Sequence, residues 1–325
     1  MATTTPSYIA ETLKRRTSRG FLARLRGGDE ISYLITLICT VSILLIVGLI
    51  VFELWSNSHQ TFKTFGFSFL KSSAWDPNAD KYGALPFIYG TCVTAFLGMI
   101  IAVPLGVAAA IFLAEMAPPK LSNFLTFLIE LLAAVPSVIY GLIGIFILVP
   151  FLKTYVVPPL QHAFGFLPIF AGSFYGLSLF SAGIVLSVMV APFIISVSRE
   201  VLMAVPVEQR EAALALGATK WETTWDIVLP NASTGIFGSI FLALARALGE
   251  TMAVTMVVGN APKISASLLS PGYSIAAVIA NEFAEASGDL YISSLIFMAL
   301  VLFGLTIVIN AVARIFIMTT QQRGA

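Results

Sequence analysis

The chain has 325 residues, of which 58% are hydrophobic and 11% are charged, and its mean hydropathy is +0.93. A soluble domain carries roughly 25% charged residues, so a water-soluble enzyme of this length is excluded. The formal net charge of +1 gives no support for general nucleic-acid binding. Cys39 and Cys92 lie in apolar runs far from His59 and His162, so neither a disulfide framework nor a metal site is expected.

The hydropathy pattern predicts an all-α membrane protein with six transmembrane helices, since about 20 apolar residues are needed to cross the hydrocarbon core. A basic tail (1–30) precedes a first span (31–55) whose apolar core is too long for a signal peptide. A loop (56–82) leads to a core (83–317) and a short tail (318–325). The five further spans are expected near 85–114, 121–149, 172–197, 232–258 and 290–317.

Lysine and arginine are distributed unequally between the two sides of these spans. If the N-terminus is cytoplasmic, twelve of the 18 basic residues lie on the cytoplasmic side and five outside, with Arg246 inside a span. Basic residues favour cytoplasmic loops, so both termini and the loop 199–230 are predicted to be cytoplasmic and loop 56–82 extracytoplasmic. The basic tail is expected to contact membrane lipid and not nucleic acid.

The cytoplasmic loop 199–230 is the longest polar stretch between spans and contains two helix signals. Pro206 suits the first turn of an alanine-rich helix, and Gly217 suits its C-terminal cap. Thr219 and Glu222 have the spacing of a capping box that opens a second short helix. A short, smooth helix of this kind can lie in a groove on another protein.

The same loop resembles the EAA loop of ABC importer permeases. Glu211, Ala212 and Ala213 are followed by Gly217 and then by Ile-x-Leu-Pro at the family's spacing. In that family the loop docks on the ATP-hydrolysing subunit, so the resemblance assigns ATPase coupling to these four residues. The alternative is an ordinary alanine-rich connector.

The chain contains no Gly-x-x-x-x-Gly-Lys-Ser/Thr sequence that could cradle the phosphates of ATP. The resemblance therefore implies a transport subunit that is not an enzyme and binds no cofactor. ATP and Mg²⁺ are expected on a separate partner subunit.

Two charges lie within the fifth predicted span. Arg246 and Glu250 are four residues apart, which would place them on one face of an uninterrupted helix, with Arg246 near its middle. A charge at that depth costs at least about 2.5 kcal/mol unless it faces water or a partner. The pair is therefore either a site on a substrate path, where arginine suits a tetrahedral oxyanion, or a structural ion pair. Glu130 in the third span either faces the path or pairs with a neighbouring helix or a backbone donor.

The sequence around this pair resembles the fifth-helix motif of the C-type permease subunits of phosphate-specific ABC importers. It reads Ala-Arg-Ala-Leu-Gly-Glu-Thr-Met-Ala-Val over 245–254, whereas the A-type sister subunits usually continue Gly-Glu-Thr with Ala-Pro. Segments 75–77, 112–115 and 136–141 agree with the same subunit, and the resemblance covers about 65–317. It implies the type-I ABC importer permease (MetI-like) fold and the import of inorganic phosphate.

The resemblance also implies partners and a location. The partners are an A-type phosphate permease, a dimeric ABC ATPase and an extracytoplasmic phosphate-binding protein, and the location is the cytoplasmic (inner) membrane of a prokaryote. One alternative is the same machine for another oxyanion, molybdate or sulfate. An ATPase-independent channel is a further alternative, against which the complete EAA loop argues.

Overall fold

The computed structural model describes residues 29–321, which are helical apart from turns, loops and one isolated bridge. The predicted basic tail up to residue 28 and the last four residues of the chain lie outside the described residues. Within the described part, six helices are long and apolar enough to cross a membrane, in agreement with the prediction. They are Ser32–Asn57, Leu85–Met116, Ser137–Phe164, Leu179–Met203, Lys220–Leu248 and Asp289–Ile315.

The chain divides into two compact units, residues 1–56 and 57–325. In the first unit the structure describes helix α3 (Asp29–Asn57). The hydroxyls of Thr36 and Thr40 donate to the carbonyls of Ser32 and Thr36, each at 2.8 Å. These bonds satisfy the polar side chains within the helix, as an apolar surrounding requires.

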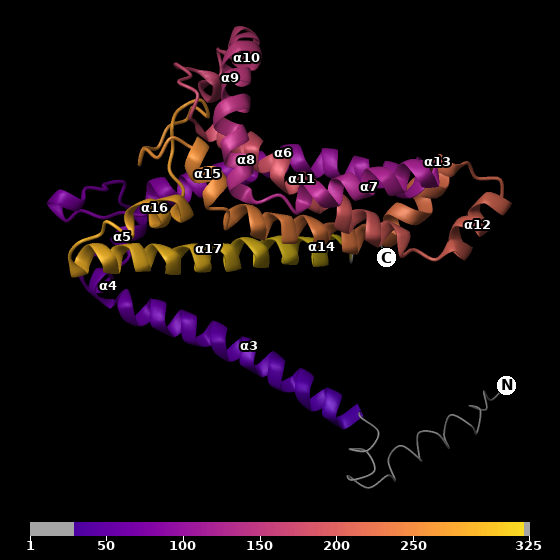
Figure 1. Cartoon of the computed structure of the whole chain (residues 1–325), viewed down its shortest axis with the longest axis horizontal. Coiled ribbons are helices and arrows are strands. Elements are labelled where there is room, and N and C mark those ends of the chain that lie inside the picture. The colour runs from indigo at the N-terminus through magenta and orange to yellow at the C-terminus, as the bar shows by residue number, and fades with distance from the viewer. Residues whose placement is uncertain (1–28, 322–325) are drawn as a thin grey trace. The chain divides into compact units, whose positions relative to one another are not determined.

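The second unit contains the remaining described elements (Figure 1). Its first part comprises α4 (His59–Phe65), α5 (Ser68–Lys71), the 3-10 turn η1 (Pro77–Ala79), α6 (Leu85–Ile111) and the π turn η2 (Phe112–Met116). Its middle part comprises α7 (Pro119–Ala133), α8 (Ser137–Ile143), the π turn η3 (Gly144–Leu148), α9 (Val149–Phe151), the π turn η4 (Leu152–Val156), α10 (Val157–Phe164), the 3-10 turn η5 (Pro168–Phe170) and α11 (Leu179–Met203). Its last part comprises α12 (Val207–Ala215), α13 (Lys220–Glu222), the π turn η6 (Thr223–Val228), α14 (Leu229–Leu248), α15 (Met252–Val257), α16 (Ile275–Glu282) and α17 (Asp289–Gln321).

Helix α11 is the central helix of this unit and packs against α6, α14 and α7. In its apolar window 61% of the residues are buried, against 22–33% in the other spans of the unit. A Cβ atom at Gly183 would lie 2.5 Å from the side chain of Leu97, and one at Gly106 would lie 2.8 Å from that of Ile194. The small residues thus let α6 and α11 approach closely, as is common between transmembrane helices.

The third and fourth helices differ from the predicted spans 121–149 and 172–197. Helix α7 ends at Ala133 because Pro136 disfavours a helical conformation in the residue before it, and a new helix starts at Ser137. Helix α11 starts only at Leu179, because the hydroxyl of Ser178 caps it by accepting from the N–H of Ser181 at 3.1 Å.

A cluster of aromatic side chains surrounds Glu282 at the end of α16. Its carboxylate accepts hydrogen bonds from Trp75 Nε1 at 2.9 Å, Tyr291 at 2.7 Å and Tyr273 at 3.3 Å. The pKa of Tyr273 is raised to about 12, mainly by burial of the phenol and also by the nearby Glu282 carboxylate. The hydrogen bond with the amide of Asn281 acts in the opposite direction and lowers this pKa. The cluster holds the Trp75 loop against α16 and α17.

Candidate functional site

The fifth span is interrupted at the point where the sequence predicts a charged pair. Helix α14 ends at Leu248, and α15 starts at Met252, so the expected continuous helix over 232–258 is wrong. Glu250 lies in the break, where its Oε1 accepts a hydrogen bond from the N–H of Ala253 at 3.1 Å. Among the described residues no ion pair joins Arg246 to Glu250; the acid instead bonds to a backbone N–H in the first turn of the short helix that follows.

Arg246 lies in the last turn of α14, close to the end of the span and not near its middle as predicted, and it is exposed on the surface of this chain. Its Cζ atom lies 5.9 Å from the centre of the Phe193 ring on α11, within the range of a cation–π contact. An arginine inside a span is costly where it faces lipid. Its exposure therefore indicates that this face of α14 meets another subunit or a water-filled path.

The helix predicted over 121–149 is interrupted as well, between Ala133 and Ser137, so the third membrane-length helix begins only at Ser137. The hydroxyl of Tyr140 donates to the carbonyl of Leu132 at 2.7 Å across this break. Broken helices are tolerated at membrane depth only where such bonds or a polar cavity satisfy the freed backbone groups.

The two interrupted helices meet, because α15 packs against α8. A Cβ atom at Gly141 would lie 2.5 Å from Sδ of Met256 and 3.3 Å from Cα of Ala253. The second segments of both broken spans are thus in close contact. Interrupted helices that meet in this way are typical of substrate sites in transporters.

Glu130 lies on α7, one turn before the break of the third span, and it is exposed. Its carboxylate has no hydrogen-bond or ion-pair partner among the described residues. The structure therefore does not bring Glu130 into a pair with a neighbouring helix of this chain, and its role on a path stays a prediction.

The predicted helix signals of the cytoplasmic loop are confirmed. Helix α12 follows Pro206 and ends at a Schellman motif, in which Gly217 donates to the carbonyl of Leu214 at 3.0 Å and Ala218 donates to that of Ala213 at 3.1 Å. Gly217 has a φ of +92°, which favours glycine. The predicted capping box of Thr219 and Glu222 is present at the start of α13.

The loop is shorter than the predicted range 199–230, because α11 continues to Met203 and the fifth helix already starts at Lys220. Its docking candidates Glu211, Ala212 and Gly217 are exposed, and Ala213 is half-buried. A groove of about 560 Å³ runs between α12 and the start of the fifth helix. It is lined mainly by Gln209, Ala212, Ala213, Leu216, Glu222 and Asp226.

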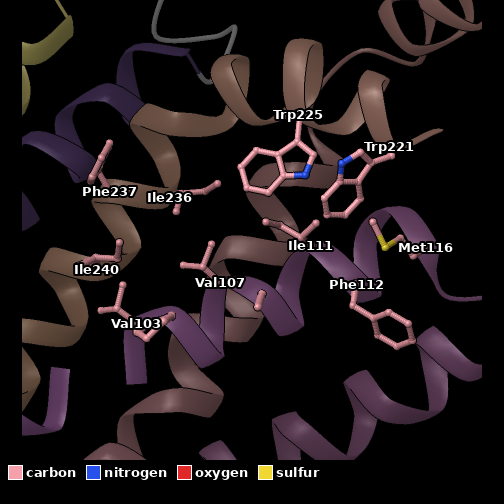
Figure 2. A pocket seen from close by; sticks show the side chains of 12 residues that line it. Val103, Val107, Ile111, Phe112, Met116, Trp221, Trp225, Ile236, Phe237 and Ile240 are labelled. Carbon is pink, nitrogen blue, oxygen red and sulfur yellow. The ribbon is translucent and has the colours of Figure 1, made fainter. Parts of the chain in front are cut away.

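A second cavity, of about 480 Å³, lies between α6 and α14 beneath two tryptophans (Figure 2). Trp221 and Trp225 contact each other edge to face, with ring centres 5.5 Å apart. The rest of the lining is apolar, including Val107, Ile111 and Ile240. No charged side chain faces this cavity, so it offers an anion no counter-charge and is not a substrate site for an oxyanion.

One charged contact is not evident from the sequence alone. Arg210 on α12 and Glu115 in η2 form an ion pair of 2.9 Å. The two residues do lie at motifs that the sequence shows, since Arg210 directly precedes the EAA segment and Glu115 ends the segment 112–115. No group of three His, Cys, Asp or Glu side chains that could hold a metal is found within residues 29–321.

Residues 102–319 match the family described as "Binding-protein-dependent transport system inner membrane component". A Mesorhizobium japonicum protein named "Phosphate transport system permease protein PstC" is 45% identical over 98% of this chain and 99% of its own length. The chain belongs to this permease family. A Pasteurella multocida protein of the same name is 43% identical to this permease over 97% of the chain and 94% of that protein.

A solved structure shows the same fold. The matched chain belongs to a bacterial ABC transporter involved in the import of the acidic polysaccharide alginate, with a TM-score of 0.53 and 18% identity over 90% of this permease and 98% of that chain. The predicted type-I ABC importer permease fold is thereby confirmed. With six apolar helices between residues 29 and 321, this permease is a multi-pass inner-membrane protein.

Proposed function

We propose that this chain is the C-type permease subunit of an ATP-driven importer and forms half of the translocation path for inorganic phosphate. The observation that carries the proposal is similarity along the whole chain, 45% identity over 98% of it, to a protein named as a phosphate transport permease. No feature of the described residues favours molybdate, sulfate or an ATPase-independent channel over phosphate.

Arg246 supplies the counter-charge for phosphate on the path, and Glu250 borders the same site. The support is that Arg246 is exposed in the last turn of α14, directly before the helix ends, without a carboxylate partner among the described residues. Glu250 fixes that interruption through its bond to Ala253. Glu130, exposed before the other interruption, is the weaker candidate for the path.

The loop with Glu211, Ala212, Ala213 and Gly217 docks on a dimeric ABC ATPase, which binds ATP and Mg²⁺. The exposure of its small side chains supports this role. An A-type permease completes the path, and an extracytoplasmic binding protein delivers phosphate. Both termini are cytoplasmic, in accordance with the distribution of lysine and arginine.

The test is ATP-dependent uptake of radiolabelled phosphate by proteoliposomes that contain this chain with the partner permease, the ATPase and the binding protein. We expect uptake that requires ATP and persists in excess sulfate or molybdate. ATP-driven uptake of molybdate or sulfate without phosphate uptake would contradict the proposal.

The role of Arg246 is tested in the same assay. Arg246→Gln is expected to lower uptake more than tenfold while the complex still assembles, because this exposed side chain contributes little to packing. Arg314→Gln, which removes another exposed arginine from α17, serves as the control and should retain uptake. Normal uptake by Arg246→Gln would exclude Arg246 from the path.

A further inference from the structure

One arginine ties the coupling helix α12 to α6 and α11. Nη2 of Arg210 lies 2.9 Å from Oε1 of Glu115, and the two side chains are 19% and 11% exposed. Glu115 lies in the π turn η2 at the end of α6. A largely buried ion pair thus joins two segments that are 95 residues apart in the sequence.

The same guanidinium also holds the end of α11. Nη2 of Arg210 donates to the carbonyl of Leu202 at 2.7 Å, and Nη1 donates to the carbonyl of Val205. The last carbonyls of a helix lack partners within that helix, and a cation there is favourable. Arg210 therefore contacts α6 and α11, which pack against each other along the bundle.

The π turn that carries Glu115 is held on another side by α7. The hydroxyl of Ser122 donates to the carbonyl of Leu113 at 2.8 Å, and Arg199 on α11 donates to that hydroxyl at 3.3 Å. A π turn widens the helix by one residue and is frequent at functional positions. Three helices therefore meet at η2, and Arg210 adds the coupling helix to them.

Helix α12 has a separate contact with the start of the fifth helix, where it packs against η6. Movement of α12 can reach α14, and with it Arg246, through this packing. It can reach α6 and α11 through Arg210. Two independent connections of this kind would move both sides of the bundle together.

We propose that the Arg210–Glu115 pair is the positioning contact that transmits movement of the coupling helix α12 to α6 and α11. This inference rests on the proposed function, because it assumes that α12 docks on an ATPase. Arg210 and Glu115 act through the helices they join and do not contact the substrate. Loss of the pair leaves ATP hydrolysis running but disconnects it from half of the bundle.

The experiment measures phosphate imported per ATP hydrolysed in proteoliposomes that contain the complete transporter. Arg210→Gln and Glu115→Gln are each expected to lower this ratio at least fivefold, while the ATPase still copurifies in its normal amount and hydrolyses ATP. The exchange Arg210→Glu with Glu115→Arg should restore the ratio to within twofold of wild type. Lys120→Gln removes a neighbouring exposed charge and is the control.

A ratio that stays within twofold of wild type in both single variants would overturn the proposal. So would loss of the copurified ATPase, which would assign Arg210 to docking, and so would failure of the charge exchange to restore the ratio. The proposed function itself fails only if the wild-type complex imports no phosphate, so the two results are distinguishable.

Discussion

Oε1 of Glu250 accepts a hydrogen bond from the backbone N–H of Ala253 at 3.1 Å, which places this acid at the start of α15 instead of in a pair with Arg246. We expect Glu250→Gln to keep this hydrogen bond, because a glutamine carbonyl also accepts. Glu250→Leu removes it and should cost about 1 kcal/mol of stability. The midpoint of thermal unfolding of the purified complex measures the difference.

The matched control is Glu285→Leu, which removes an exposed acid outside the spans. It should leave the unfolding midpoint unchanged. If Glu250→Gln destabilised the protein as much as Glu250→Leu, the charge and not the hydrogen bond to Ala253 would be the contribution of this residue.

Gly217 is expected to tolerate only residues that adopt a positive φ. A Cβ atom there meets nothing within 4 Å, so Gly217→Val acts through its backbone, where the left-handed conformation costs roughly 1–2 kcal/mol. Gly217→Val should reduce copurification of the ATPase and ATP-dependent uptake, and Gly217→Asn should be milder.

Gly238 on α14 is the matched control for this substitution. A Cβ atom at Gly238 also meets nothing within 4 Å, but its backbone is helical. Gly238→Ala should therefore have no adverse effect. Equal uptake by Gly217→Val and wild type would refute the role of the Schellman motif.

Because α8 contacts α15, a substitution at Met256 should restore stability that is lost by a substitution at Gly141. Gly141→Ala would bring a methyl group to 2.5 Å from Sδ of Met256, and overpacking of this kind costs about 1–3 kcal/mol. Met256→Ala should recover part of the lost thermal stability, because it removes the atom in conflict. Gly304→Ala, with open space around it, is the control. Additive destabilisation in the double variant would disprove this contact.

Tyr273 predicts a loss of stability at high pH. Its pKa in the folded protein is about 12, above the ordinary value of 10.0, mainly because the ring is buried. Because the folded protein holds the phenol proton more tightly than the unfolded chain, the contribution of Tyr273 to the free energy of unfolding is complete below pH 10. It decreases as the pH rises through 12. The unfolding midpoint of Tyr273→Phe should fall less than that of wild type between pH 10 and 12, whereas exposed Tyr175→Phe should behave as wild type. Parallel curves for Tyr273→Phe and wild type would contradict the assignment.

The proposed orientation can be tested by cysteine labelling in whole cells. Ala79 and Ala215 are both exposed, and they lie on opposite sides of the predicted membrane. In a chain whose Cys39 and Cys92 have been replaced, Ala79→Cys should react with an impermeant thiol reagent. Ala215→Cys should react only after permeabilisation. The reverse labelling pattern would show that the orientation in the membrane is opposite to the proposed one.

The amino-acid sequence by itself is sufficient to predict the features that depend on residues close together in the chain. The number of spans follows from apolar runs of sufficient length, since each helix satisfies its own backbone. The Schellman motif at Gly217 and the capping box at Thr219 likewise need only residues within five positions of each other.

Tertiary structure decided where the spans break and which charges meet. The spacing of Arg246 and Glu250 favours an ion pair on a continuous helix. Helix α14 ends between them, however, and Glu250 accepts a hydrogen bond from the backbone N–H of Ala253. Arg210 and Glu115 meet across 95 residues of sequence, and no local pattern specifies that distance. Helix periodicity gives only the face on which a charge lies. Its partner depends on how α6, α11 and α12 pack, because that packing brings residues distant in the sequence within hydrogen-bonding range.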